Sequence, residues 1–177
     1  QLHLKVPGRA LQWAANQSLR MALNKFDAVW VPDAPLEPSL SGMLSHPPLR
    51  DHAIRYIGPL SRLQSLDRQP EYDVAVVLSG PEPQRSILEA RLLEQAMSLP
   101  QKFIFVQGRT QAKEHHYVAE NIEVVSYLTS REVSEVMAAT AVVVCRSGYS
   151  SIMDLAAIGK KAILIPTPGQ TEQEYLA

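Results

Sequence analysis

The sequence is poor in cysteine and almost balanced in charge, and each shortage excludes a class of protein. Cys145 is the only cysteine among 177 residues, so an internal disulfide and a cysteine metal cluster are excluded. The formal net charge of −1 gives no whole-chain field to attract nucleic acid, and we expect no nucleic-acid partner. No segment reaches the roughly 18 apolar residues that span a bilayer, and a signal-peptide pattern is missing. These features predict a globular protein of a reducing, cytoplasmic compartment.

Two common nucleotide-binding motifs are also missing. The sequence contains neither a GxGxxG after a strand nor a GxxxxGK[ST], so the usual dinucleotide and P-loop interpretations lose their main support. His115 and His116 stand together in a polar stretch without a cysteine or acidic cluster at ligand spacing, so we expect them to be solvated. The sequence therefore predicts no metal site and no cofactor.

What the sequence does contain is a regular alternation of strand-like and helical segments after residue 72. Apolar runs indicate buried strands at 73–80, 102–108, 121–128, 141–147 and 161–169. Helical segments lie between them at 81–99, 130–140 and 151–159. Because the strands are continuously apolar, we expect a parallel sheet covered on both faces. The sequence predicts an α/β fold over 70–177, a doubly wound parallel sheet with helices on both faces.

The first 69 residues have a different character. Residues 9–25 have helical composition, 26–32 and 54–60 resemble short strands, and 33–49 form a proline-rich loop or linker. We interpret 1–69 as the end of a preceding domain with its linker. The chain does not begin with Met and stops within the helix-like TEQEYLA, so we expect both ends to be cuts in a longer protein.

Small and polar residues gather where the predicted strands end, at SGPEP (79–83) and RSGYSS (146–151). Ligands of open parallel sheets bind beyond the carboxyl ends of the strands. Glycine lets backbone N–H groups approach a ligand, a helix N-terminus favours negative charge, and arginine adds charge-assisted hydrogen bonds to phosphate. The candidate phosphate-binding residues are Ser79, Gly80, Arg146, Ser147, Gly148 and Ser150.

The serines at the second of these turns have an alternative interpretation. Helix starts rich in serine also arise from capping alone. Ser150 or Ser151 would then cap the helix, and Asp154 would complete a capping box three residues after Ser151. The residues themselves leave both interpretations open.

The stretch VMAATAVVVCRSGYSSIMDLAAIGKKAILIPTPGQTEQEYLA (136–177) resembles the C-terminal, donor-binding half of family 28 glycosyltransferases. It carries, in the order of the family, Cys145, Arg146, Ser147, Gly148, Asp154, Gly159, Pro166 and Gln173. The loop at 79–85 and the segment 124–140 also resemble the family. The resemblance is strong over 70–177 and weak over the first 60 residues, which correspond to the end of an N-terminal domain and an interdomain linker.

The resemblance implies a two-lobed GT-B fold in which a nucleotide sugar lies between two domains. The backbone around Leu128 would meet the base, Asp154 would hydrogen-bond the ribose hydroxyls, and Gln173 would reach the ribose or the sugar. A carboxylate suits a ribose because its two oxygens can accept hydrogen bonds from both ribose hydroxyls. The turns at Ser79-Gly80 and at 146–148 would hold the diphosphate of a donor that the family indicates to be UDP-linked.

The resemblance also implies that the sugar passes to an acceptor, which is a glycan, a lipid-linked molecule or a small molecule. The catalytic base would lie on the N-terminal domain, so the 177 residues are expected to bind the donor but hardly to turn it over. That domain would also carry any peripheral association with the inner face of the membrane. Two alternatives remain: a nucleotide-sugar epimerase or hydrolase on the same fold, and a non-catalytic donor-binding subunit of a split transferase.

Overall fold

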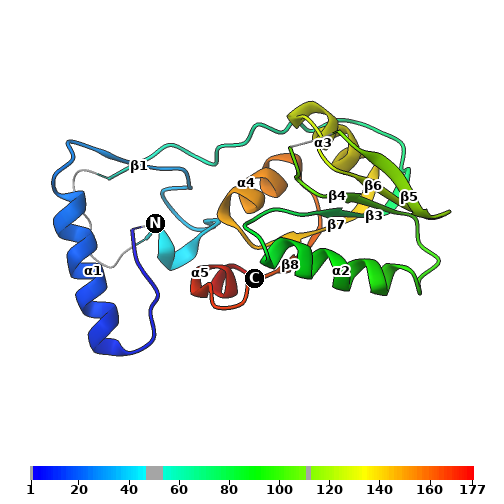
Figure 1. Cartoon of the computed structure of the whole chain (residues 1–177). Helices are drawn as coiled ribbons and strands as arrows, with labels where there is room; N and C mark the ends of the chain where they lie inside the picture. Colours follow the sequence, from blue (N-terminus) through cyan, green and yellow to red (C-terminus); the bar gives the residue numbers. More distant parts are fainter. Residues whose placement is uncertain (1, 47–53, 111–112) are drawn as a thin grey trace.

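The larger part of the protein is a six-stranded sheet with the order β5-β6-β4-β3-β7-β8 (Figure 1). The structure is a computed structural model, and it describes residues 2–46, 54–110 and 113–177. The strands are β3 (Tyr72–Val77), β4 (Phe103–Val106), β5 (His115–Ala119), β6 (Ile122–Val125), β7 (Thr140–Arg146) and β8 (Ala162–Ile165). All neighbours pair in parallel except β5 and β6, which are antiparallel. The predicted α/β fold with a mostly parallel sheet is confirmed.

Helices cover both faces of this sheet. The helices of this part are α2 (Gln84–Ala96), α3 (Ser130–Ala138), α4 (Tyr149–Ile158) and α5 (Thr171–Leu176). On β4, Phe103 and Phe105 belong to the apolar cluster beneath α2, whereas Ile104 and Val106 belong to the cluster on the α3 face. Because consecutive side chains of a strand point to opposite faces, a strand buried on both faces must be apolar at every position.

Among the strands of the described residues, β5 is the one that the sequence did not indicate. It follows the loop after β4 and returns antiparallel beside β6, at the edge of the sheet. Its first four residues are exposed, so no buried apolar run marks it in the sequence. His115 is therefore part of a strand rather than of a loop, and its Nε2 lies 3.0 Å from Oε1 of Glu123 on β6.

The N-terminal part contains helix α1 (Arg9–Leu23), the short strands β1 (Val29–Val31) and β2 (Ile54–Tyr56), and a 3₁₀ helix, η1 (Gly42–Leu44). The helix and the two strands lie where the sequence predicts them, and β1 pairs in parallel with β2. Residues 47–49 of the proline-rich loop lie outside the described residues.

Asp33 organises the described remainder of that loop. Its carboxylate is fully buried and accepts hydrogen bonds from the backbone N–H groups of Ala34, Leu40 and Ser41, and from the Ser41 hydroxyl. Burial by itself would raise the pKa of Asp33, but these hydrogen bonds outweigh it and lower the pKa below its usual value. The loop is thus built around a buried carboxylate ion.

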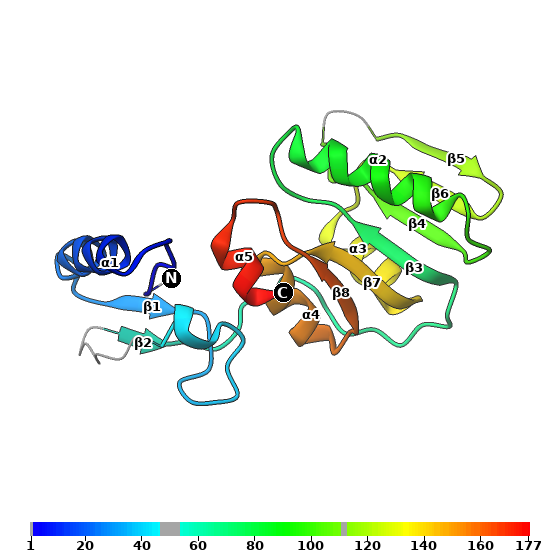
Figure 2. The same ribbon diagram turned by 90° about the horizontal axis from the view of Figure 1, so that it is seen from below.

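The N-terminal part contacts the larger part through α4 and α5. Figure 2 shows α5 on the side of the α/β part that faces β1 and β2. The hydroxyl of Tyr149, at the start of α4, donates a 2.8 Å hydrogen bond to the carbonyl of Pro32. On α5, the Thr171 hydroxyl donates to the carbonyl of Lys5 at 2.6 Å. The Lys5 ammonium in turn lies 3.8 Å from the centre of the Tyr175 ring.

Candidate functional site

A cavity of about 830 Å³ opens beyond the carboxyl ends of β3, β4, β6 and β7. From β3 the chain builds β4 and then β6 on one side, and it then crosses back through α3 to form β7 on the other side of β3. The strand order therefore reverses between β3 and β7, and the ends of both strands line the cavity. Five of the residues that the sequence indicated as donor-binding line this one cavity: Ser79, Gly80, Leu128, Ser150 and Asp154. They come from the segments after β3 and β6 and from the first two turns of α4.

Two glycines explain why the loops after β3 and β4 approach each other so closely. Gly80 and Gly108 both line the cavity and have positive φ angles, of 103° and 71°, which a side chain disfavours. At Gly108 a Cβ atom would lie 2.8 Å from the carbonyl oxygen of Leu78. The close approach of these loops therefore depends on glycine at position 108.

A segment from outside the α/β part completes the cavity wall. Residues 60–64, which we name the strap, run across α4 and α3. The N–H of Leu60 contacts the Met153 sulfur on α4 at 3.4 Å, and the N–H of Gln64 donates to Ser134 Oγ on α3 at 3.1 Å. Leu63 is buried in the apolar cluster below these helices. The strap is thus fastened at both ends and through its middle.

Arg62 is the cationic residue of the strap, and it lines the cavity. Within the described part of the chain, its exposed guanidinium has neither a hydrogen-bond nor an ion-pair partner. No sequence motif marks Arg62, because it lies in a polar stretch that follows no predicted strand of the α/β part. Arg62 instead precedes β3, and the fold carries it to the edge where the strands end.

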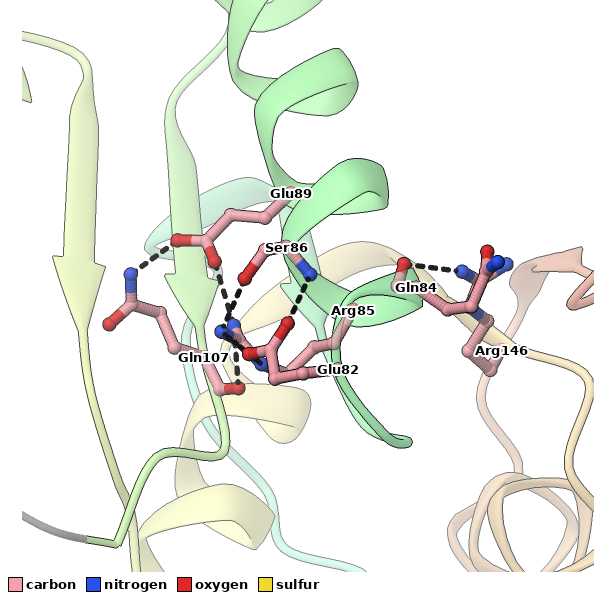
Figure 3. A network of polar contacts seen from close by, with 7 residues as sticks. All are labelled: Glu82, Gln84, Arg85, Ser86, Glu89, Gln107 and Arg146. Atoms are coloured by element: carbon pink, nitrogen blue, oxygen red, sulfur yellow. Dashed lines mark hydrogen bonds and ion pairs between the residues drawn. The ribbon is translucent and has the colours of Figure 1, made fainter.

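Arg146, in contrast, is committed to the protein's own backbone. Its side chain is buried, and it donates a 2.9 Å hydrogen bond to the carbonyl of Pro166. A second hydrogen bond, also of 2.9 Å, goes to the carbonyl of Gln84 (Figure 3). Burial lowers the pKa of this guanidinium, which stays far above neutral pH. Arg146 therefore ties the end of β7 to the loop after β8 and to the start of α2.

Ser147 and Gln173 are also engaged in internal contacts. Ser147 is fully buried and its hydroxyl donates to the carbonyl of Gln173 at 2.8 Å. The side-chain oxygen of Gln173 accepts from the N–H of Thr167 at 2.9 Å. Together with Arg146 and Gly148, these residues stand outside the described wall of the cavity.

The start of α4 excludes one of the two interpretations of its serines, the capping one. The helix begins at Tyr149, its N-cap residue is Gly148, and no side chain caps it. Ser150 and Ser151 thus lie within the first turn, and the capping interpretation is wrong. The first turn of a helix has N–H groups without partners in the helix, and Ser150 and Ser151 place this turn at the cavity.

A buried ionic network beside the cavity holds the loops after β3 and β4 together (Figure 3). Arg85 on α2 donates from Nη1 to Glu89 at 2.7 Å and from Nε to Glu82 at 2.9 Å. Glu89 also accepts a short hydrogen bond from the side chain of Gln107, which directly follows β4. The network fixes the start of α2, and with it the turn at Gly80, against the end of β4.

Other reactive groups are few in the described residues. Cys145 lines the cavity, but burial raises the pKa of its thiol to about 11, so it stays protonated at neutral pH. Among these residues no three His, Cys, Asp or Glu side chains are placed to hold one metal ion. Nor does any described helix combine the length and the apolar character needed to cross a membrane.

Comparison with known proteins extends these observations. UDP-N-acetylglucosamine--N-acetylmuramyl-(pentapeptide) pyrophosphoryl-undecaprenol N-acetylglucosamine transferase of Methylobacterium radiotolerans is 54% identical over 41 residues, which make up 23% of this chain and 11% of that protein. The enzyme of the same name from Methylorubrum populi matches with the same identity and coverage. The chain thus spans about a tenth of the length of these curated relatives.

A solved structure agrees in fold. The crystal structure of the glycotransferase of kitacinnamycin superposes with a TM-score of 0.57 at 18% identity, over 89% of this chain and 41% of that one. Residues 77–177, more than half of the sequence, match the family described as glycosyltransferase family 28 C-terminal domain. The chain belongs to this family.

Proposed function

We propose that this chain is the donor-binding half of a glycosyltransferase and that the cavity holds a nucleotide sugar for transfer to an acceptor. The observation that carries the proposal is the meeting of Ser79, Gly80, Leu128, Ser150 and Asp154 around one cavity at the strand-order reversal. UDP is the proposed nucleotide, since the printed names of the curated relatives specify a UDP-linked donor.

Within the cavity, each part of the donor would meet a group of suitable chemistry. The base would lie against the backbone at Leu128, and the carboxylate of Asp154 would accept hydrogen bonds from the ribose hydroxyls. The diphosphate would lie between the turn at Gly80 and the first turn of α4, where free N–H groups favour an anion. Arg62 lines the cavity and has no hydrogen-bond or ion-pair partner among the described residues, so it would add a charge-assisted contact.

The proposal gives a structural role, not a ligand-binding one, to Arg146, Ser147, Gly148 and Gln173. The hydrogen bonds of Arg146 and Ser147 hold the turn between β7 and α4, and Gly148 is the N-cap of α4. Gln173 holds the loop after β8 against that turn. These contacts would shape the anion-binding turn, whose backbone N–H groups would do the binding.

During transfer the bond between the sugar carbon and the diphosphate breaks, and negative charge develops on the leaving diphosphate. Arg62 and the first turn of α4 would stabilise that charge because they line the cavity before the donor binds. The general base for the acceptor would come from the other lobe of the full-length enzyme. Because the curated relatives act on an undecaprenol-linked molecule, a lipid-linked acceptor and attachment to the inner membrane face belong to the proposal.

Calorimetric titration of the chain with UDP, UMP, GDP and ADP tests the donor site. We expect UDP to bind best and Asp154→Ala to weaken it by about 1–3 kcal/mol, the scale for hydrogen bonds to a charged group. Arg62→Ala should weaken UDP by a similar amount while leaving uridine unaffected, because it lacks phosphate. If neither this chain nor the full-length protein binds any of the four nucleotides, the proposal is wrong.

A further inference from the structure

A hydroxyl group of the strap contacts the carboxylate proposed to hold the ribose. Ser61 Oγ donates a 2.5 Å hydrogen bond to Oδ1 of Asp154, a residue 93 positions later in the sequence. The same Ser61 oxygen accepts a 3.0 Å hydrogen bond from the N–H of Leu63. A serine hydroxyl has a single proton, so its donation is directed entirely to Asp154.

The position of Ser61 does not depend on this hydrogen bond. Leu60 and Gln64, on either side, contact α4 and α3 through their backbone N–H groups. Leu63 is only 8% exposed and anchors the strap in the apolar cluster below. Ser61 is therefore a fixed donor beside a side chain that could otherwise rotate.

The carboxylate of Asp154 can still accept hydrogen bonds from a ligand, since each of its oxygens has two lone pairs and Ser61 occupies one of the four. The Asp154 side chain is half-buried in the cavity wall, and Oδ2 has no hydrogen-bond partner in the described part of the chain. An aspartate free to rotate loses conformational entropy when it binds a ligand. An aspartate already held through one oxygen has lost that entropy before the ligand arrives, which strengthens binding.

We propose that Ser61 is a positioning residue for donor binding, which holds the carboxylate of Asp154 so that its free oxygen faces the ribose hydroxyls. The inference rests on the proposed function, because it requires a ribose at Asp154. It also means that the strap contributes to donor binding, although the strap belongs to the segment that connects the N-terminal part with the α/β part. If Ser61 acts through Asp154, its replacement must weaken the binding of a nucleotide that has ribose hydroxyls. It must not change the binding of a nucleotide whose ribose lacks the 2′ and 3′ hydroxyls.

Titration of Ser61→Ala with UDP and with 2′,3′-dideoxyuridine 5′-diphosphate tests the role. We expect Ser61→Ala to weaken UDP about fivefold, the scale for ordering one side chain, and to leave the dideoxy analogue unchanged. Ser61→Thr, which keeps the hydroxyl, should stay within about twofold of the wild type. The matched control is Ser98→Ala, since Ser98 is an exposed serine just after α2 whose hydroxyl donates to the carbonyl of Gln95 within that helix.

Three outcomes would overturn the inference, and they differ from one another. Unchanged UDP affinity in Ser61→Ala means that Asp154 needs no positioning. Equal weakening of UDP and the dideoxy analogue means that Ser61 shapes the strap and does not act through the ribose. If the wild-type chain and the full-length protein bind neither nucleotide, the proposed function itself fails, and the inference fails with it.

Discussion

Replacing Arg85 by methionine removes the cation from the buried network between α2 and the end of β4. The Arg85 side chain is 5% exposed and that of its partner Glu89 is 11% exposed, so both charges are largely shielded from water. Without Arg85, the Glu89 carboxylate keeps only the hydrogen bond from Gln107 among the described contacts. Leaving one member of a buried pair without its partner costs about 3–5 kcal/mol.

We therefore expect Arg85→Met to lower the free energy of unfolding by about 3 kcal/mol, because the methionine still packs where the arginine stem lay. The double variant Arg85→Met with Glu89→Gln should recover part of this loss, since it removes the unpaired charge and keeps a side-chain acceptor for Gln107. Urea unfolding followed by far-UV circular dichroism measures both differences, provided that the slopes of the transitions agree.

Arg131→Met is the matched control. Arg131 is also paired with a glutamate on its own helix, at 3.3 Å from Glu135, but its side chain is 87% exposed. An exposed pair of this kind contributes less than about 1 kcal/mol. The reasoning is refuted if Arg85→Met costs no more than Arg131→Met, or if the double variant is less stable than Arg85→Met alone.

Two further predictions concern the loops around the cavity. Gly108→Ala should lower stability by about 1–3 kcal/mol in thermal unfolding, because a Cβ there meets the backbone oxygen of Leu78 at a positive φ. Gly159→Ala, at a φ of 65° but with open space around it, should cost less, and equal losses would contradict the steric argument. At the start of α3, Thr129 and Glu132 form a capping box, and hydrogen bonds with the Thr129 N–H first and Lys113 second lower the pKa of Glu132 to about 2. Since this pKa lies below the ordinary value of 4.5, the contribution of Glu132 to stability is present above pH 4.5 and is lost as the pH falls toward 2. Glu132→Gln should therefore flatten the acid side of the stability profile measured by urea unfolding, and an unchanged profile would contradict the assignment.

The sequence could predict the strands that are buried on both faces, because such strands leave no polar position. Phe103–Val106 is apolar throughout and forms β4 as expected. It could not predict β5, since an edge strand with exposed residues needs no apolar pattern. His115 and His116 belong to this strand, and the polar stretch around them carries no strand pattern, although both are exposed as expected.

The candidate site divides in the same way. Gly80 and Leu128 follow strands, and Asp154 lies in the helix that follows β7. The parallel topology is therefore enough to bring all three to one edge of the sheet. Arg62 could not be found by that rule, because it reaches the same edge from a linker. The sequence indicated Arg146 as a phosphate-binding residue. Only the fold shows that its side chain donates to two backbone carbonyls instead.

The sequence by itself determined the alternation of strands and helices, the positions of the polar turns and the family to which the chain belongs. These properties depend on local composition and order along the chain, which the sequence states directly. The tertiary structure decided which polar groups remain available to a ligand. Ser61 and Asp154 are 93 residues apart, and only the packing of the strap on α3 and α4 brings the hydroxyl and the carboxylate together. Hydrogen bonds between distant segments depend on that packing, and no local pattern of residues encodes them.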